Sequence, residues 1–245
     1  FALLAGIASF GIGNMTQGNS ISGMVQNNFH VPTWITGLVL AILTGVVVIG
    51  GVKSIATICG KLVPFMAFFY IIGCIAIICI NHAYILPALK EIFSSAFSAR
   101  AAGGGFIGAS VITAARYGIA RGLFSNESGL GSAPIADAAA QTRNPVRQAL
   151  VSMSGVFWDT IVVCLMTGLV LVSTIIKEPE AAINPATGSL FTGGDLTTHA
   201  FSAIPVVGPI VLTIGLITFA WSTILGWSYY GEKCWEYLLG KKALM

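Results

Sequence analysis

The stretch GGGFIGASVITAARYGIARGLFSNESGLGSAP, from Gly103 to Pro134, carries the strongest structural signal in this chain. Its first half is mostly apolar and about as long as a helix that crosses a bilayer. It begins, however, with four glycines in six residues around Phe106, and glycine disfavours helix because it loses the most backbone freedom on folding. An interrupted membrane helix is tolerated where it lines a cavity, and its free backbone groups can then bind ions or charged ligands. The stretch predicts either such a binding break or a tight helix contact through small residues.

The composition places the chain among membrane proteins. Hydrophobic residues make up 56% and charged residues 9%, and the mean hydropathy is +0.87, whereas an average soluble protein has about 25% charged residues. The formal net charge of +3 is small and no run of basic residues accompanies it, which argues against nucleic-acid binding. We expect an all-α protein that crosses the membrane several times.

Six apolar segments are each close to or above the ~20 residues that a helix needs to cross a bilayer: residues 1–26, 34–51, 62–81, 103–123, 146–176 and 203–231. Nine of the twelve basic residues fall in or beside connections on one side. By the positive-inside rule that side is cytoplasmic, as in a multi-pass protein of the plasma (inner) membrane. We expect one membrane domain over residues 1–245 and, because Phe1 lies within an apolar segment, a portion of a longer protein.

Two of the segments carry polar side chains at membrane depth. Asn14 and Gln17 are three residues apart in the first segment and share one helix face. Amides at this depth either hydrogen-bond between helices or face a substrate. Asp159 lies near the middle of the fifth segment, where a carboxylate can neutralise an ion, take up a proton, or pair structurally with a polar neighbour.

The sixth segment combines hydroxyl groups with a large aromatic side chain. Ser222 and Thr223 place hydroxyl oxygens beside main-chain carbonyls such as that of Phe219, and oxygen ligands are what a hard cation such as sodium requires. Thr223 and Trp227 are four residues apart and therefore share a face, with a polar group beside a wide apolar ring. The alternative for Trp227 is an aromatic belt at the membrane surface.

Four stretches taken together resemble the alanine/glycine:cation symporter family, the sodium:alanine symporters: GIGNMTQGNSIS, KLVPFMAFFYIIG, RYGIARGLFSNESGLGSAPIADAAAQT and FAWSTILGWSYYGEKCWEYL. The resemblance covers nearly the whole chain in the same order, and RGLFSNESGLGSAPIADAAA is its most specific part. It implies the fold of amino-acid carriers with two inverted repeats of five helices, broken in the first and sixth. By this resemblance the six segments correspond to core helices three to eight, and the first two and the last are missing.

The resemblance also implies roles for individual residues. Substrate contacts fall at Phe106, Gly108, Thr223, Trp227, Gln17 and Asn14, and a sodium site falls at Ser222, Thr223 and the Phe219 carbonyl. Asp159 keeps either an ionic or a structural role. The missing first core helix should supply the other half of both sites.

The implied activity is sodium-coupled symport of a small neutral amino acid, alanine or glycine, with sodium ion as the cofactor and no enzymatic step. The implied partners are the amino acid, membrane lipids and the missing helices of the same transporter, with no nucleic acid. Two alternatives stay open: a proton-coupled carrier that uses Asp159, and an ion channel or pore subunit that uses the glycine break as a filter. An intramembrane serine enzyme is disfavoured because no histidine lies in an apolar segment to activate a serine.

Overall fold

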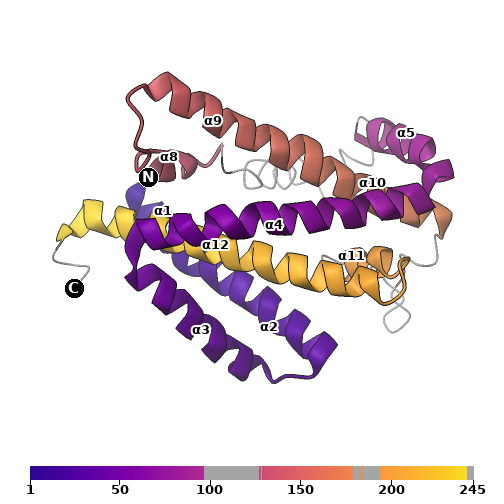
Figure 1. The fold of residues 1–245 in the computed structure, drawn as a ribbon, viewed down its shortest axis with the longest axis horizontal. Coiled ribbons are helices and arrows are strands. Elements are labelled where there is room, and N and C mark those ends of the chain that lie inside the picture. Colours follow the sequence, from indigo (N-terminus) through magenta and orange to yellow (C-terminus); the bar gives the residue numbers. More distant parts are fainter. Residues whose placement is uncertain (97–126, 128, 179–182, 184–193, 242–245) are drawn as a thin grey trace, which may run out of the picture. The chain divides into compact units, whose positions relative to one another are not determined.

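The computed structural model describes residues 1–96, 127, 129–178, 183 and 194–241, and every regular element in this part of the chain is a helix (Figure 1). The all-α fold predicted from composition is therefore confirmed. In chain order the elements are α1 (Ala2–Ala8), η1 (Ser9–Met15), α2 (Thr16–Phe29), α3 (Thr33–Ile49), α4 (Gly51–Ile80), η2 (His82–Tyr84), α5 (Ile85–Ala96), α8 (Ala133–Asp137), α9 (Pro145–Phe157), η3 (Trp158–Cys164), α10 (Leu165–Lys177), α11 (Gly194–Phe201) and α12 (Val207–Leu239).

The described residues contain three helices that are long and apolar enough to cross a membrane. They are Gly51–Ile80, the continuous run Pro145–Lys177 through α9, η3 and α10, and Val207–Leu239. The fifth predicted segment agrees with the second of these helices to within one residue at each end. The sixth is confirmed as a long apolar helix that starts four residues later and ends eight residues later than predicted. The fourth predicted segment, with Phe106 and Gly108, lies outside the described residues.

The second predicted segment is the shorter apolar helix α3, of 17 residues. It ends at Ile49, and the chain turns there because Gly51 has a positive φ of 68°, which a residue without a side chain adopts at little cost. The first predicted segment is not one uniform α-helix. It consists of α1, the seven-residue π-helix η1 and α2, with Asn14 inside the π-helical part.

Helix α4 begins earlier than the sequence indicated, so one boundary was wrong. The third segment was expected from residue 62, but α4 has 30 residues, and Pro64, two residues after that expected start, lies in its interior. A proline there removes one main-chain hydrogen bond, and its ring crowds the carbonyl four residues earlier. Residue 60 is a glycine, which leaves space beside that carbonyl.

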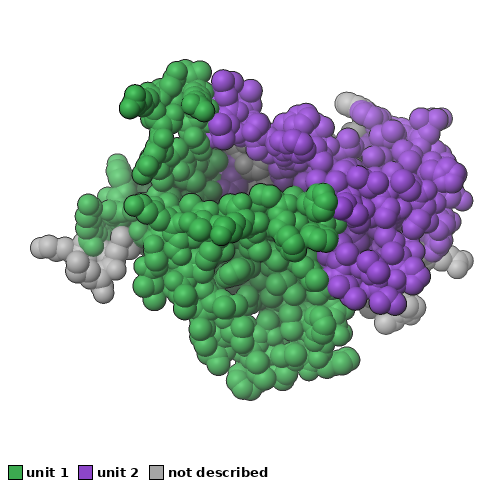
Figure 2. Space-filling view, viewed as in Figure 1, with its two compact units in different colours: residues 1–69, 131–148, 213–245 green, residues 70–130, 149–212 purple. Residues whose placement is uncertain are grey.

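The chain divides into two compact units, coloured separately in Figure 2. Unit 1 comprises residues 1–69, 131–148 and 213–245, and unit 2 comprises residues 70–130 and 149–212. Unit 1 is held together by a cluster of four buried side chains from α3, α4 and α12, namely Val47, Ile55, Leu225 and Tyr229. The expectation of a single membrane domain stays a prediction.

Unit 2 packs the end of α4 against α10 and α11. Tyr70 stacks on the fully buried Phe201 with ring centroids 5.7 Å apart, and its hydroxyl lies 2.7 Å from the hydroxyl of Thr167. Cys74 and Val170 are also fully buried in this unit. Many large apolar side chains elsewhere on the long helices are exposed, such as Phe68 at 61% and Met153 at 64%, which is expected of surfaces that face lipid.

Candidate functional site: hydroxyl and amide groups on α12 and η1

Two neighbouring hydroxyl groups of α12 donate hydrogen bonds to the same main-chain carbonyl. Ser222 Oγ donates to the carbonyl oxygen of Phe219 over 2.8 Å, and Thr223 Oγ1 donates to the same oxygen over 3.0 Å. Both side chains are half-buried, and within the described part of the chain no other hydrogen bond reaches either hydroxyl. Three uncharged oxygens therefore lie close together. The two hydroxyl oxygens keep lone pairs of the kind that a hard cation takes, whereas the carbonyl oxygen accepts both hydroxyl hydrogens.

Trp227 lies one turn after Thr223 on the same face of α12. Its side chain is 4% exposed, and its ring meets the ring of Tyr230 edge to face at a centroid distance of 5.6 Å. A residue of an aromatic belt would present its ring to the membrane surface, so this burial favours an interior role. Trp227 therefore places a large buried apolar ring one turn away from the two hydroxyl groups.

Asn14 joins the π-helix η1 to the same helix, α12. Its Nδ2 donates to the carbonyl oxygen of Ser9, five residues earlier, over 2.7 Å, and its Oδ1 accepts from Ser228 Oγ over 3.4 Å. Ser228 directly follows Trp227. The structure thus brings Asn14 to the part of α12 that carries the predicted site, although the two segments are more than 200 residues apart in the sequence.

Small residues on α1 and η1 face large ones on α12. A Cβ atom added to Gly13 would lie 2.5 Å from both Cβ and Cγ of Trp227, and a Cβ added to Gly6 would lie 3.1 Å from Cε2 of Trp235. Sequence reasoning overlooked this contact. Its signal is the spacing of Gly6, Ser9 and Gly13, since small residues three or four positions apart mark close helix packing in membranes.

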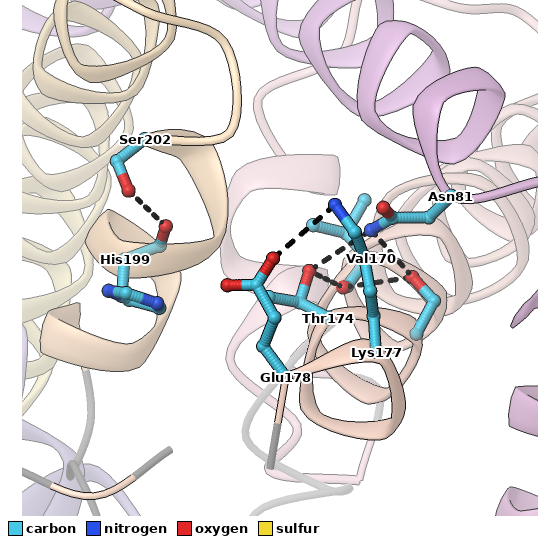
Figure 3. Close-up of polar contacts among 8 residues, drawn as sticks. Asn81, Val170, Thr174, Lys177, Glu178, His199 and Ser202 are labelled. Atoms are coloured by element: carbon cyan, nitrogen blue, oxygen red, sulfur yellow. Dashed lines mark hydrogen bonds and ion pairs between the residues drawn. The ribbon is translucent and has the colours of Figure 1, made fainter. Parts of the chain in front are cut away.

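A second polar cluster lies in unit 2 and was also overlooked. Asn81, 1% exposed, follows the last residue of α4, and its Nδ2 donates to Thr174 Oγ1 over 3.3 Å and to Ser173 Oγ over 3.4 Å. Figure 3 shows this amide directed at α10, near the turn that ends with Lys177. Both hydroxyls in turn donate to the carbonyl of Val170, so the amide closes a cluster that is already hydrogen-bonded within the helix.

The structure gives fewer contacts for the other predicted site residues. Gln17 is half-buried in the first turn of α2, and no hydrogen bond within the described residues fixes its amide. Asp159 is half-buried in η3 of unit 2, where it interacts with a neighbouring group. Phe106 and Gly108 lie outside the described residues.

The ligand atoms available at the α12 site are hydroxyl, carbonyl and amide groups. Among the described residues, no three His, Cys, Asp or Glu side chains are grouped so that they could hold a metal ion. Uncharged oxygens suit a weakly held alkali cation better than a transition metal, which prefers imidazole and thiolate.

Long apolar helices, exposed apolar surfaces and a half-buried polar site define an integral membrane protein of the cell membrane that is built from α-helices. The chain belongs to the sodium:alanine symporter family, whose family model matches residues 1–245. Members of such a family are transporters. The resemblance seen in the sequence is thereby confirmed.

Three relatives illustrate the range of similarity. The sodium/alanine symporter AgcS of Methanococcus maripaludis is 53% identical over 244 residues, which cover 100% of this chain and 52% of AgcS. The amino-acid carrier protein AlsT of Bacillus subtilis is 32% identical over 99% of this chain and 49% of AlsT. The sodium/proton-dependent alanine carrier protein of Bacillus sp. PS3 is 32% identical over 91% of this chain and 51% of its own length. The chain therefore spans about half the length of these relatives.

Proposed function

We propose that this chain forms part of a secondary active transporter that couples sodium influx to the uptake of a small neutral amino acid, alanine or glycine. The observation that carries the proposal is the convergence of the Ser222 and Thr223 hydroxyls on the Phe219 carbonyl, one turn from the buried Trp227. The family and the similarity to AgcS, a sodium/alanine symporter, support the same substrate class and ion.

In this proposal the oxygens of Phe219, Ser222 and Thr223 form one half of a sodium site. Both hydroxyl hydrogens point toward the carbonyl oxygen, so the hydroxyl lone pairs remain for the ion, and the carbonyl oxygen would join them once the hydroxyls turn toward the ion. Three ligands are fewer than a hard cation of this size takes, so the other ligands have to come from another part of the transporter. The helices expected from the part of the relatives' length that this chain does not cover, above all the first core helix, would supply them.

The amino acid would bind beside this site, with its charged groups met by main-chain groups and by Thr223, Asn14 and Gln17. Trp227 would bound the space for the substrate side chain, together with Phe106 and Gly108. Sodium binding would favour the arrangement open to the outside, and binding of both solutes would allow the helices to close and reopen inward. The exposed apolar faces would contact lipid. No bond is made or broken in the substrate.

Proton coupling is the second candidate. The alanine carrier of Bacillus sp. PS3 is described as sodium/proton-dependent, and Asp159 is a half-buried carboxylate in a long apolar run. An ion channel has weaker support, because nothing in the sequence supplies rings of charge or repeated carbonyl filters.

The test is uptake of labelled alanine by liposomes that contain the complete transporter. We expect saturable uptake that depends on a sodium gradient and is inhibited by unlabelled glycine. Uptake unchanged when choline replaces sodium would contradict sodium coupling, and uptake driven by a proton gradient in the absence of sodium would favour the second candidate. Flux that rises without saturation would favour a channel.

A further inference from the structure

Trp227 is held against the π-helix η1 at a distance that only glycine permits. A Cβ at residue 13 would lie 2.5 Å from Cβ and Cγ of Trp227 and 2.7 Å from Cδ2. Of these atoms Cγ and Cδ2 belong to the indole ring, whereas the position of Cβ follows the backbone of α12. A side chain at residue 13 would therefore displace α12 itself, since no side-chain rotation moves Cβ of Trp227.

Two further contacts on the same pair of segments prevent an easy adjustment. Gly6 faces the indole of Trp235, two turns after Trp227, and a side chain on Gly231 would meet the hydroxyl of Ser9. Ser9 is buried and its hydroxyl donates to the carbonyl of Gly6 over 2.7 Å. The α1–η1 segment and α12 thus touch over successive turns, and Trp227 cannot approach η1 any further.

The π-helical geometry sets which residue faces Trp227. In η1 the side-chain amide of Asn14 donates to the carbonyl of Ser9, five residues earlier, and its oxygen lies 3.4 Å from the hydroxyl of Ser228, which also donates to the carbonyl of Ile224 over 2.7 Å. Asn14 therefore contacts α12 from the position next to Gly13. Local π-helices occur often at functional sites, because the extra residue per turn re-aims the side chains.

We propose that Gly13 is a positioning residue that sets the size of the amino-acid side chain the transporter accepts. The missing Cβ lets Trp227 lie against η1, and in this inference the alanine methyl group lies on the side of the indole that faces away from η1. This inference rests on the proposed function, in which Trp227 bounds the substrate side chain. Gly13 itself contacts Trp227 and need not touch the amino acid.

The expected displacement is comparable to one methyl group. Carbon atoms pack at about 3.5–4.0 Å, so Gly13→Ala moves Cβ of Trp227 by about 1 Å away from η1 and toward the substrate. A methylene group more or less in an apolar pocket changes discrimination by about 10–200-fold. Alanine uptake should suffer more than glycine uptake, because glycine has no side chain to collide with the indole.

The experiment compares alanine uptake with glycine uptake by the complete transporter under an inward sodium gradient. The readout is the ratio of kcat/KM for alanine to kcat/KM for glycine. We expect Gly13→Ala to lower the alanine-to-glycine ratio by about tenfold or more. The ratio does not depend on how much protein is folded. Gly11→Ala is the matched control, since Gly11 lies in the same π-helix and a Cβ there meets no described atom within 4 Å.

A second variant keeps the test decisive if Gly13→Ala does not fold. Gly231→Ala pushes on the same contact through the hydroxyl and Cβ of Ser9, one turn after Trp227, so we expect a smaller fall of the ratio in the same direction. An unchanged ratio in a folded Gly13→Ala protein, or in Gly231→Ala if the former is lost, overturns the inference. An equal fall in Gly11→Ala overturns it as well. Absence of sodium-dependent uptake by the unmodified transporter would instead contradict the proposed function on which the inference rests.

Discussion

Two Ser–Thr pairs in this chain have the same local geometry and different surroundings. Ser173 and Thr174 of α10 donate to the carbonyl of Val170 over 3.1 Å and 2.8 Å, and Ser222 and Thr223 of α12 donate to that of Phe219 over 2.8 Å and 3.0 Å. In each pair the hydroxyls bond three and four residues back. A helix offers this arrangement to any such pair.

The difference lies in what meets the remaining lone pairs. The pair on α10 is 1% and 6% exposed, and the buried amide of Asn81 donates to both hydroxyls. The pair on α12 is half-buried, and within the described residues no donor reaches its hydroxyls. We call Ser173–Thr174 the closed pair, because its hydroxyls accept from Asn81 and so join the end of α4 to α10. We call Ser222–Thr223 the open pair, because its hydroxyl oxygens stay available for a ligand. The same local motif therefore serves packing in one helix and forms a candidate ion site in the other.

We expect the largest effect, a change in the sodium dependence of uptake, when Thr223 is substituted and not when Thr174 is. Thr223→Val keeps the shape of the side chain and removes its oxygen, and the loss of one bond to a charged group is about 1.5–3 kcal/mol, or roughly 10–100-fold. We expect the sodium concentration for half-maximal alanine uptake to rise by that factor. The matched variant Thr174→Val should leave it unchanged. Equal shifts in both variants would remove the distinction between an open and a closed pair.

The next effect tests the closed pair. Asn81→Leu removes the donor that both buried hydroxyls share and should lower the free energy of unfolding by about 1–3 kcal/mol. Thermal unfolding of the detergent-solubilised transporter measures this loss, and sodium dependence should stay as it was. Asn19→Leu is the control, because Asn19 is exposed on α2 and such surface changes are usually within about 0.5 kcal/mol. A shift of sodium dependence in Asn81→Leu would make the closed pair an ion site too.

The smallest effect concerns how the open pair is held. Trp221, the residue before Ser222, donates from its indole nitrogen to Thr44 Oγ1 of α3 over 3.2 Å. Trp221→Phe removes this bond, which is worth about 0.5–1.5 kcal/mol, and should raise the half-maximal sodium concentration by about threefold. Thr44→Val removes the same bond from the other side. The double variant should be no worse than either single one, and full additivity would show that the bond does not position the pair.

Much of the α12 site was predictable from the sequence because its contacts are local. Ser222, Thr223 and Phe219 lie within one helical turn, and Thr223 and Trp227 are one turn apart, so any helix over residues 203–231 brings them together. The long apolar runs of α9–α10 and α12 were predictable for the same reason, since length and hydropathy suffice to identify a membrane helix. The structure shows how these residues are placed, and the binding roles of all the proposed site residues stay predictions: Asn14, Gln17, Phe106, Gly108, Asp159, Phe219, Ser222, Thr223 and Trp227.

The sequence by itself determined that this is an α-helical membrane protein of the sodium:alanine symporter family with a hydroxyl pair beside an aromatic residue on its last long helix. Only the tertiary structure decided which Ser–Thr pair is closed, because the amide that closes it comes from a residue 92 positions away. It also decided that Gly13 faces Trp227, since a π-helix shifts the faces that regular helical spacing predicts. Contacts between distant segments depend on how whole helices pack, and local spacing does not encode that packing.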